Sequence, residues 1–306
     1  MKKSRVQFLA IFTAFAAVIL GISFGSGSGH GQAKPPKKES PVKPTVLISN
    51  TATANPKSPS PFAAAADQNS VLRKELAWTF GGKQQRGWYL YDPLIGQTLN
   101  TESEPGSTDF AAALAAWQKK KGLQQNGVLD QETLMALVSH WQGRRLKDKK
   151  YAEVDQLVVP DTAEFYDPSR VAELRQVERE TYEAYKRMLA AAIADPTLKL
   201  GHTEPGQLAS AEKFFKIVSA FRSREYQDRL RRQSPKAGSA GLAVNSPHFT
   251  GRALDIYVGG DPVDTRDANR AIQVNSPAYR WLVRNAQRFG FRPYFYEPWH
   301  WEYVGR

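Results

Sequence analysis

The chain has 306 residues, of which 41% are hydrophobic and 24% are charged, values close to those of an ordinary soluble globular protein. This composition excludes a polytopic membrane protein, a collagen-like fibre and a wholly disordered chain. Cysteine is absent, so any metal must be bound by the five histidines and by carboxylates. The net charge is +12, and residues 1–70 carry half of it, so the mild basicity of the remainder does not indicate a nucleic-acid partner.

Residues 1–33 have the pattern of an export segment. The positively charged start MKKSR is followed at residues 6–24 by an apolar run with three polar residues, as in a secretory signal. The run also just reaches the length that a helix needs to span a bilayer, so a cleaved signal and a single membrane anchor both stay open. Either alternative predicts an exported protein of the cell envelope, located in the periplasm or the cell wall.

Residues 34–70 are predicted to be a disordered linker. Seven of the nineteen prolines lie between residues 34 and 61, among Ser, Thr, Lys and Asn. A segment of this composition cannot bury enough apolar area to offset the entropy lost on ordering. We expect an extended chain that reaches on the order of 3 Å per residue and holds the following domains away from a membrane.

Residues 71–145 are predicted to fold as a small all-α bundle. Apolar side chains recur at spacings of three and four between Phe110 and Trp117, which is typical of one face of a helix. Gly122 is suited to end that helix, and Asp130 is suited to begin the next one.

This bundle resembles a peptidoglycan-binding domain of the first type. The matching positions are Trp117-Gln118, Gly122-Leu123, Gly127, Asp130 and Thr133-Leu134. The resemblance implies docking onto the glycan and stem peptide of the bacterial wall, but it does not identify the side chains in contact. Trp117 itself is predicted to be a core residue.

Residues 160–306 are predicted to form an α+β domain, with a small antiparallel sheet flanked by helices. Helices are expected over residues 168–194, 209–214 and 278–289, and a further one runs from the 219–227 segment through residue 232. Strands are expected at residues 217–218, at residues 253–258 and among the last thirteen residues, where bulky aromatic and polar side chains alternate.

His248 and Asp255 are seven residues apart, which would place them on opposite faces of one straight strand. A turn at Thr250-Gly251 would remove that problem and bring the two side chains together. An aspartate on a strand otherwise this apolar needs a partner, because burying a lone carboxylate is expensive. A cation would meet that need.

Glu297 and His300 lie three residues apart near the end of the chain. Two histidines and one aspartate would leave a tetrahedral zinc with an open fourth position for water, which is the catalytic rather than the structural pattern. A nearby carboxylate that is not a ligand could take a proton from that water. The same ligands suit several divalent metals, so the identity of the metal stays open.

These residues also resemble the VanY-type D-alanyl-D-alanine carboxypeptidases, which are zinc peptidases of the lysostaphin-type, dipeptidase and Hedgehog-like fold. Three motifs occur in the family's order: Ser219, Arg222, Ser223 and Gln227; then Ser246, His248, Gly251, Ala253 and Asp255; then Glu297, Trp299 and His300. The resemblance implies that His248, Asp255 and His300 bind one Zn²⁺ and that Glu297 is the catalytic base.

The resemblance further implies that Arg222 holds substrate oxygens and stabilises the tetrahedral oxyanion, a role that suits its fixed charge and planar shape. Ser246 and Gln227 would contact the peptide. Phe221 stands where the family commonly has Tyr, so any role of a hydroxyl group there is lost.

The implied activity is removal of the terminal D-Ala from peptidoglycan stem peptides, by a chain that we expect to be monomeric. The bundle at residues 71–145 would tether the enzyme to the wall polymer and raise the local substrate concentration. L,D-carboxypeptidases, dipeptidases and endopeptidases that cut L-Ala-D-Glu use the same constellation. These alternatives stay open, as does a wall-binding protein whose catalysis has lapsed.

Overall fold

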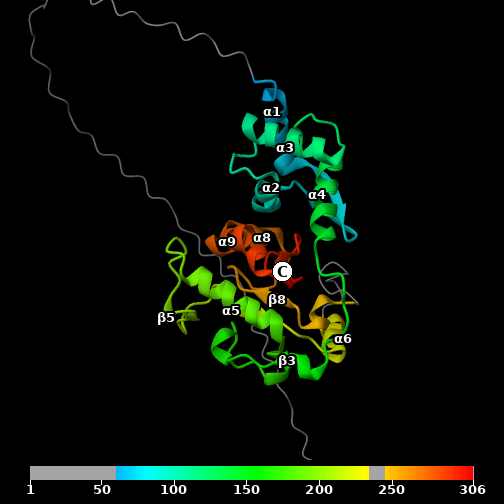
Figure 1. Cartoon of the computed structure of the whole chain (residues 1–306). Coiled ribbons are helices and arrows are strands. Elements are labelled where there is room, and N and C mark those ends of the chain that lie inside the picture. Colours follow the sequence, from blue (N-terminus) through cyan, green and yellow to red (C-terminus); the bar gives the residue numbers. More distant parts are fainter. Residues whose placement is uncertain (1–59, 234–244, 306) are drawn as a thin grey trace, which may run out of the picture. The chain divides into compact units, whose positions relative to one another are not determined.

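The structure is a computed structural model that describes residues 60–233 and 245–305 (Figure 1). The described residues all belong to one compact unit. The predicted export segment therefore lies outside the described residues, as does most of the predicted linker. Within the described part of the chain, no helix is both long enough and apolar enough to cross a membrane.

Residues 60–145 form a helical module that also contains a β-hairpin. Its elements are α1 (Ala63–Glu75), β1 (Ala77–Phe80), β2 (Lys83–Arg86), the 3₁₀ turn η1 (Tyr89–Tyr91), α2 (Asp92–Leu99), α3 (Thr108–Lys121) and α4 (Gln131–Gly143). The hairpin was not predicted. Its signal is Gly81-Gly82, where both residues have positive φ, at 57° and 77°. This backbone conformation joins two antiparallel strands through a tight turn and favours glycine.

Helix α1 corrects one predicted boundary, because it begins inside the segment that we assigned to the linker. Residues 63–70 are helical, so the linker does not extend to residue 70. The alanines at residues 63–66 favour a helix, and Ala65 and Ala66 are buried in the contact of α1 with α3. The proline content predicted a linker, but it did not predict the residue at which side chains become buried.

The predicted helices of the module are present with their expected ends. Helix α3 stops at Gly122, which has a φ of 71°. Helix α4 is capped by Asp130, whose carboxylate accepts a hydrogen bond from Thr133 N at 2.8 Å. Trp117 is buried in the core, as predicted.

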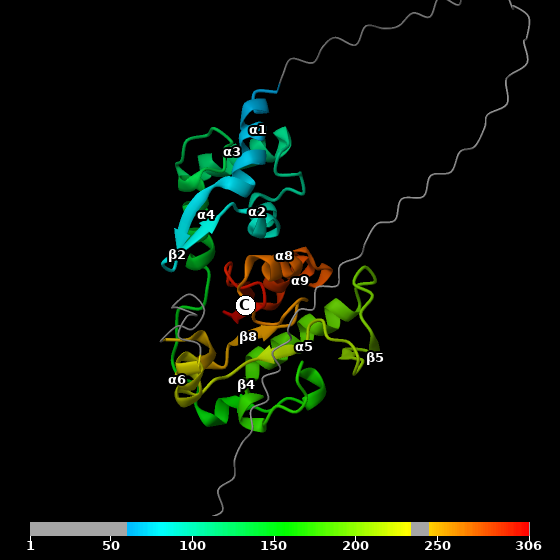
Figure 2. The same ribbon diagram turned by 180° about the vertical axis from the view of Figure 1, so that it is seen from behind.

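The rest of the described chain is an α+β arrangement (Figure 2). Its strands are β3 (Leu157–Val158), β4 (Val177–Glu178), β5 (His202–Glu204), β6 (Gln207–Leu208), β7 (Ile217–Ser219), β8 (Ala253–Ile256), β9 (Phe291–Pro293) and β10 (His300–Tyr303). Its helices are α5 (Arg179–Ile193), α6 (Arg224–Gln233), α8 (Asp267–Asn275) and α9 (Pro277–Asn285). Its 3₁₀ turns are η2 (Val154–Gln156), η3 (Thr162–Glu164), η4 (Ala172–Leu174), η5 (Pro247–Thr250) and η6 (Ala286–Phe289).

The main sheet has the strand order β7-β8-β10-β9, and every neighbouring pair is antiparallel. Strands β8 and β10 occupy its centre, and all of their residues are buried. Trp301 packs toward α9, with its ring centroid 6.2 Å from that of Tyr279. The residues that alternate with it, His300 and Glu302, share the other face of β10. Polar side chains on that face are buried and must therefore find partners within the protein.

Two predicted helices differ from the structure. The helix expected over residues 168–194 begins only at Arg179, because Val177–Glu178 pairs with β3 and Glu178 caps the helix through Glu180 N and Thr181 N. Residues 209–214 are not helical. There, the Glu212 carboxylate accepts hydrogen bonds from nearby backbone N–H groups, and such bonds compete with a helix.

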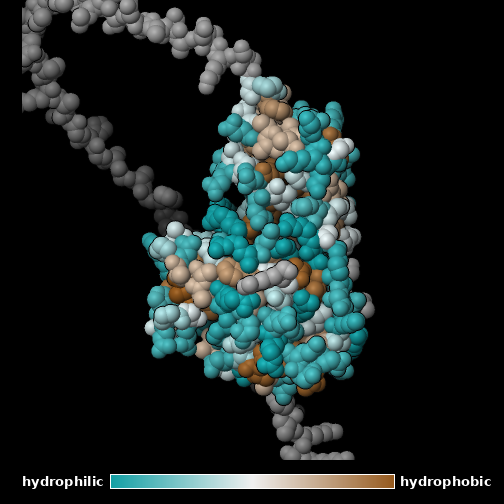
Figure 3. Space-filling view, in the orientation of Figure 1, coloured by the Kyte–Doolittle hydropathy of each residue, from teal (hydrophilic) through white to brown (hydrophobic). Residues whose placement is uncertain are grey.

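The helical module packs directly on the α+β part. Helix α2 contacts α9, and η1 contacts α8. Arg270 on α8 is 1% exposed and donates a hydrogen bond to the Tyr91 hydroxyl at 2.8 Å. The face of the molecule in Figure 3 is mostly hydrophilic, with small and separate apolar patches. The buried aromatic side chains of the module are Trp78, Trp88, Tyr91, Phe110, Trp117 and Trp141.

Candidate metal centre

The turn between η5 and β8 places His248 beside Asp255. Ser246 caps η5, and its hydroxyl accepts a hydrogen bond from His248 N at 3.3 Å. Gly251 then reverses the chain with a φ of 67°, and a Cβ at this position would lie 2.8 Å from Glu178 N. Glycine is thus required both by its conformation and by the close approach of β4. The predicted turn at Thr250-Gly251 is confirmed.

Strand pairing supplies the third member of the cluster. Asp255 on β8 and His300 on β10 are register partners across the central strand pair. Directly opposed residues point to the same face of a sheet with Cβ atoms about 5 Å apart. The two side chains therefore meet although 45 residues separate them in the chain.

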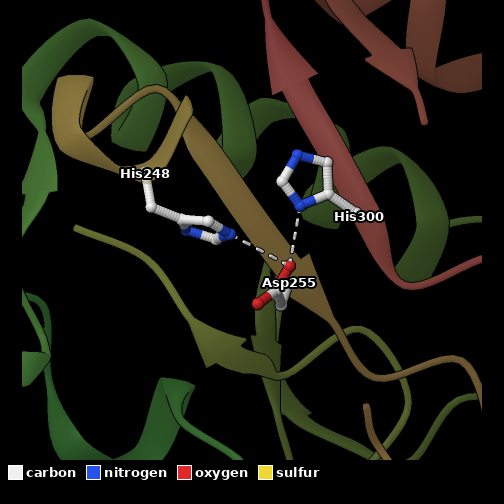
Figure 4. Close-up of side chains that lie close together, drawn as sticks. All are labelled: His248, Asp255 and His300. Atoms are coloured by element: carbon white, nitrogen blue, oxygen red, sulfur yellow. Dashed lines mark hydrogen bonds and ion pairs between the residues drawn. The ribbon is translucent and has the colours of Figure 1, made fainter. Parts of the chain in front are cut away.

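His248, Asp255 and His300 form a compact buried cluster (Figure 4). Asp255 Oδ1 lies 3.3 Å from His248 Nε2 and 2.9 Å from His300 Nδ1. One ligand atom from each residue lies within 4.8 Å of the other two. The three residues are between 1% and 4% exposed, so their polar atoms must be satisfied by one another or by a cation.

The outer ring nitrogens show how well the cluster suits a metal ion. His248 Nδ1 lies 2.6 Å from the Ala220 carbonyl oxygen, and His300 Nε2 lies 3.2 Å from Glu302 Oε1. An imidazole that donates its outer N–H to an acceptor presents a lone pair at the inner nitrogen, which is the usual arrangement of metal-binding histidines. The two nitrogens and one carboxylate oxygen fit Zn²⁺ or a similar divalent cation.

The three members of the metal-free cluster differ in their protonation. Burial, reinforced by the charge of Arg222, lowers the pKa of His248 to about 4, so this ring is neutral at neutral pH. Burial alone would raise the pKa of Asp255, but His248 and Arg222 hold it well below its usual range. Burial opposes the charged form of His300, yet the hydrogen bonds to Asp255 and Glu302 outweigh this effect and raise its pKa to about 9, so a metal ion must displace a proton from this ring in order to bind Nδ1.

Arg222 is the nearest cationic side chain to the cluster. Its Nη2 donates to Asp255 Oδ2, and its Nε donates to Ser219 Oγ at 3.0 Å. Its backbone N–H donates to the His248 carbonyl oxygen at 3.2 Å. Strand β7 and the turn after it thus carry Arg222 to the oxygen of Asp255 that faces away from the two histidines.

Glu297 occupies the connection between β9 and β10, three residues before His300. Two backbone hydrogen bonds define this turn, from Glu297 N to Tyr294 O at 3.1 Å and from His300 N to Glu297 O at 2.9 Å. The side chain is 7% exposed. Burial raises the pKa of Glu297 to about 7, against the opposing effect of the His300 charge.

The helical module packs around the segment that precedes Glu297. Phe295 lies between the two parts of the chain, with ring centroids 4.7 Å from Phe80, 5.4 Å from Tyr91 and 5.9 Å from Trp141. The Arg270 guanidinium lies 4.5 Å from the centroid of the Tyr296 ring. Side-chain packing therefore adds to the backbone hydrogen bonds that hold the Glu297 turn.

The structure places the remaining predicted residues as follows. Ser246 is buried, with its hydroxyl at the cap of η5, and Gln227 is buried on α6. The substrate contacts expected of Arg222, Ser246 and Gln227 stay predictions.

Glu302 was not predicted as a site residue, yet it is fully buried and contacts His300. Burial would raise the pKa of Glu302, but its hydrogen bond with His300 and the charges of His300 and Arg145 lower it to about 2. The available signal was its spacing, because residues two apart on a strand share a face.

Residues 174–306 match the model of a family described as VanY: D-alanyl-D-alanine carboxypeptidase. The match supports a VanY-family peptidase. It covers less than half of the chain, and this VanY segment contains all seven candidate site residues named from the sequence. It also supports carboxypeptidase activity on peptidoglycan. The helical module lies outside it, and its likeness to a peptidoglycan-binding domain stays a prediction.

One solved structure with similarity to the chain is that of the LdcB LD-carboxypeptidase, described for its peptidoglycan recognition. The sequence identity is 25%, and the comparison covers 52% of this chain and 72% of that chain, with a TM-score of 0.36. At this TM-score the overall geometries agree too little for the likeness to bear on fold or activity. No curated protein matches the chain.

Proposed function

We propose that the chain is an exported zinc D,D-carboxypeptidase that removes the terminal D-Ala from peptidoglycan stem peptides. The observation that carries this proposal is the buried cluster of His248, Asp255 and His300, with Glu297 three residues before the last ligand. The VanY family match supports the substrate class. Cleavage of the D-Ala–D-Ala bond, and zinc as the metal, are the finer parts of the proposal.

The metal would be held by His248 Nε2, Asp255 Oδ1 and His300 Nδ1, which leaves a position for water in a four-coordinate site. Zn²⁺ bound there would lower the pKa of that water and polarise the scissile carbonyl. The outer acceptors, Ala220 O and Glu302 Oε1, keep both rings oriented toward the site.

Glu297 would act as the general base. Its pKa of about 7 lies near the operating pH, where a group can both accept and release a proton efficiently. The carboxylate would take a proton from the attacking water and later pass it to the leaving amine. The Glu297 carboxylate is buried and its pKa is raised, so it accepts a proton more readily than an exposed glutamate does.

Arg222 would stabilise the negative charge that develops on the carbonyl oxygen. Its guanidinium uses Nε and Nη2 for Ser219 and Asp255, so Nη1 takes no part in those two bonds. A permanent cation in a buried site stabilises such a charge without reorganisation. Ser246 and Gln227 would contact the peptide.

The parts of the chain before the VanY segment complete the proposal. Residues 1–33 would direct export, either as a cleaved signal or as a single membrane anchor, and the helical module would bind wall polymer. Such a tether raises the local substrate concentration without taking part in the chemistry. The enzyme would work as a monomer in the cell envelope.

Mass spectrometry of stem peptides tests this function. We expect the zinc-loaded full chain to remove one alanine from a pentapeptide, and we expect a chelator to abolish the reaction and added zinc to restore it. A matched tetrapeptide serves as the second substrate. Loss of alanine from the tetrapeptide alone would replace the proposal with an L,D-carboxypeptidase, and internal cleavage would replace it with an endopeptidase. Intact peptides and intact wall fragments would contradict the enzymatic function.

A further inference from the structure

Glu302 is a buried carboxylate whose two oxygens have separate partners. Oε1 lies 3.2 Å from His300 Nε2 and 3.1 Å from Arg145 Nε, and Arg145 Nη2 donates to the same oxygen. Oε2 accepts a hydrogen bond from the backbone N–H of Leu146 at 2.9 Å. A single side chain therefore joins a candidate metal ligand to a segment more than 150 residues earlier in the chain.

That earlier segment is the exit from the helical module. Helix α4 ends at Gly143, and Arg145 and Leu146 follow at once, well before the VanY segment begins at residue 174. Arg145 is fixed from both sides. Its Nη1 donates to Gln142 Oε1 on α4 at 3.0 Å, and its guanidinium lies 3.9 Å from the centroid of the Tyr294 ring. The module thus provides the cation that balances the negative charge of Glu302.

Arg145 affects His300 through the negative charge of Glu302, which contacts both residues. A buried carboxylate that loses its cationic partner is strongly destabilised, and without Arg145 only the Leu146 backbone N–H would hold Glu302 from the side of the module. The Glu302 carboxylate would then no longer be a fixed acceptor for His300 Nε2. The ring would then lose the contact that sets its orientation and the tautomer with a lone pair at Nδ1.

We propose that Arg145 is a positioning residue of the metal centre, which acts through Glu302 to hold His300 ready to bind the cation. The inference rests on the proposed metal site. It makes the helical module a structural component of that site, in addition to any role in wall binding. Arg145 does not contact the metal or the substrate in this proposal.

Zinc affinity of the full chain tests the inference without an activity assay. Competition with a chromophoric chelator should show that Arg145→Ala binds zinc about 10–100-fold more weakly, the usual cost of removing an outer partner of a ligand. Arg144→Ala is the matched control. Arg144 is the preceding residue, has the same charge and also reaches across to the α+β part, where Nη2 donates to Gln287 Oε1 at 2.5 Å. We expect the control to bind zinc as tightly as the unaltered chain.

A double-mutant cycle with Glu302→Gln separates positioning from a general loss of stability. If Arg145 acts through the carboxylate, Arg145→Ala should change zinc affinity little further once Glu302 is replaced. The absorption spectrum of the Co²⁺-loaded protein should differ between Arg145→Ala and Arg144→Ala, because it reports ligand geometry. Thermal unfolding of each metal-free variant sets a temperature at which all are folded.

Three results would overturn the inference. Arg145→Ala with unaltered affinity and spectrum would make the Arg145–Glu302 pair a purely structural contact, and the metal site would stand. Additive effects in the cycle would show that Arg145 does not act through Glu302. An unaltered chain that binds no zinc or cobalt would overturn the inference and the proposed metal function together.

Discussion

Strand β8 and the connection between β9 and β10 each bring one carboxylate into the buried centre of the site. Asp255 on β8 is 1% exposed and Glu297 on the connection is 7% exposed, yet their pKa values move in opposite directions. Asp255 has His248, His300 and Arg222 as direct partners, which stabilise its charge. For Glu297 the cost of burial dominates, and it raises the pKa.

This difference supports the two chemical roles that we propose. A carboxylate that stays ionised suits a ligand, whereas one with a pKa near 7 suits a proton carrier. The interactions that hold the two carboxylates in place differ as well. Cross-strand register holds Asp255 against His300, whereas aromatic packing from the helical module holds the segment before Glu297.

The largest effect is expected at Asp255, the carboxylate that we propose as a metal ligand. Asp255→Asn keeps the shape of the side chain but removes its charge, so we expect loss of stoichiometric zinc and of all activity. Metal analysis of the purified protein measures this. The control is Asp92→Asn, since Asp92 is also an ion-paired aspartate, half-buried, with Oδ2 at 2.8 Å from Arg73 Nε. Full zinc in Asp255→Asn would remove Asp255 from the ligand set.

A smaller effect is expected at Glu297, and only on the chemistry. Glu297→Gln should bind zinc normally and lose about 10²–10⁴-fold in kcat, the typical contribution of a positioned general base. Steady-state kinetics beside metal analysis separate the two quantities. Glu164→Gln provides a matched change at a carboxylate that contacts Tyr182 and Lys186, where activity should stay unchanged. Loss of zinc from Glu297→Gln would make Glu297 a ligand instead.

The smallest expected effect is on the pH dependence of activity, which tests the difference between the pKa values of Asp255 and Glu297. In the metal-free protein, carboxyl ¹³C NMR should show Glu297 titrating near pH 7, while Asp255 stays ionised to well below its usual range. Activity needs the Glu297 carboxylate, so kcat/KM should fall by up to about tenfold per unit as pH drops below the pKa of Glu297. Because a bound cation favours the carboxylate, this decline should begin below pH 7 in the loaded enzyme. Titration of Glu297 near pH 4.5 in the metal-free protein would contradict the expected difference between the two pKa values.

Local patterns in the sequence were sufficient for much of the protein. The ends of α3 and α4 at Gly122 and Asp130 were predictable because capping depends on a few adjacent residues. The turn at Thr250-Gly251 followed from the odd spacing of His248 and Asp255. The proposed ligand set came from residue types in a recognisable order. The helix starts at residues 168 and 209 were wrong, because the side chains of Glu178 and Glu212 make local hydrogen bonds that apolar periodicity does not register.

Tertiary structure decided the features that depend on distant partners. The register of β8 against β10 made Asp255 and His300 neighbours, and no spacing within either strand specifies that pairing. The contact of Glu302 with Arg145 joins residues 157 positions apart, and the packing of Phe80 on Phe295 likewise crosses from the module to the site. The sequence by itself therefore determined which side chains could do the chemistry. Only the fold decided which buried charges are compensated, because compensation depends on how closely the partners approach in space.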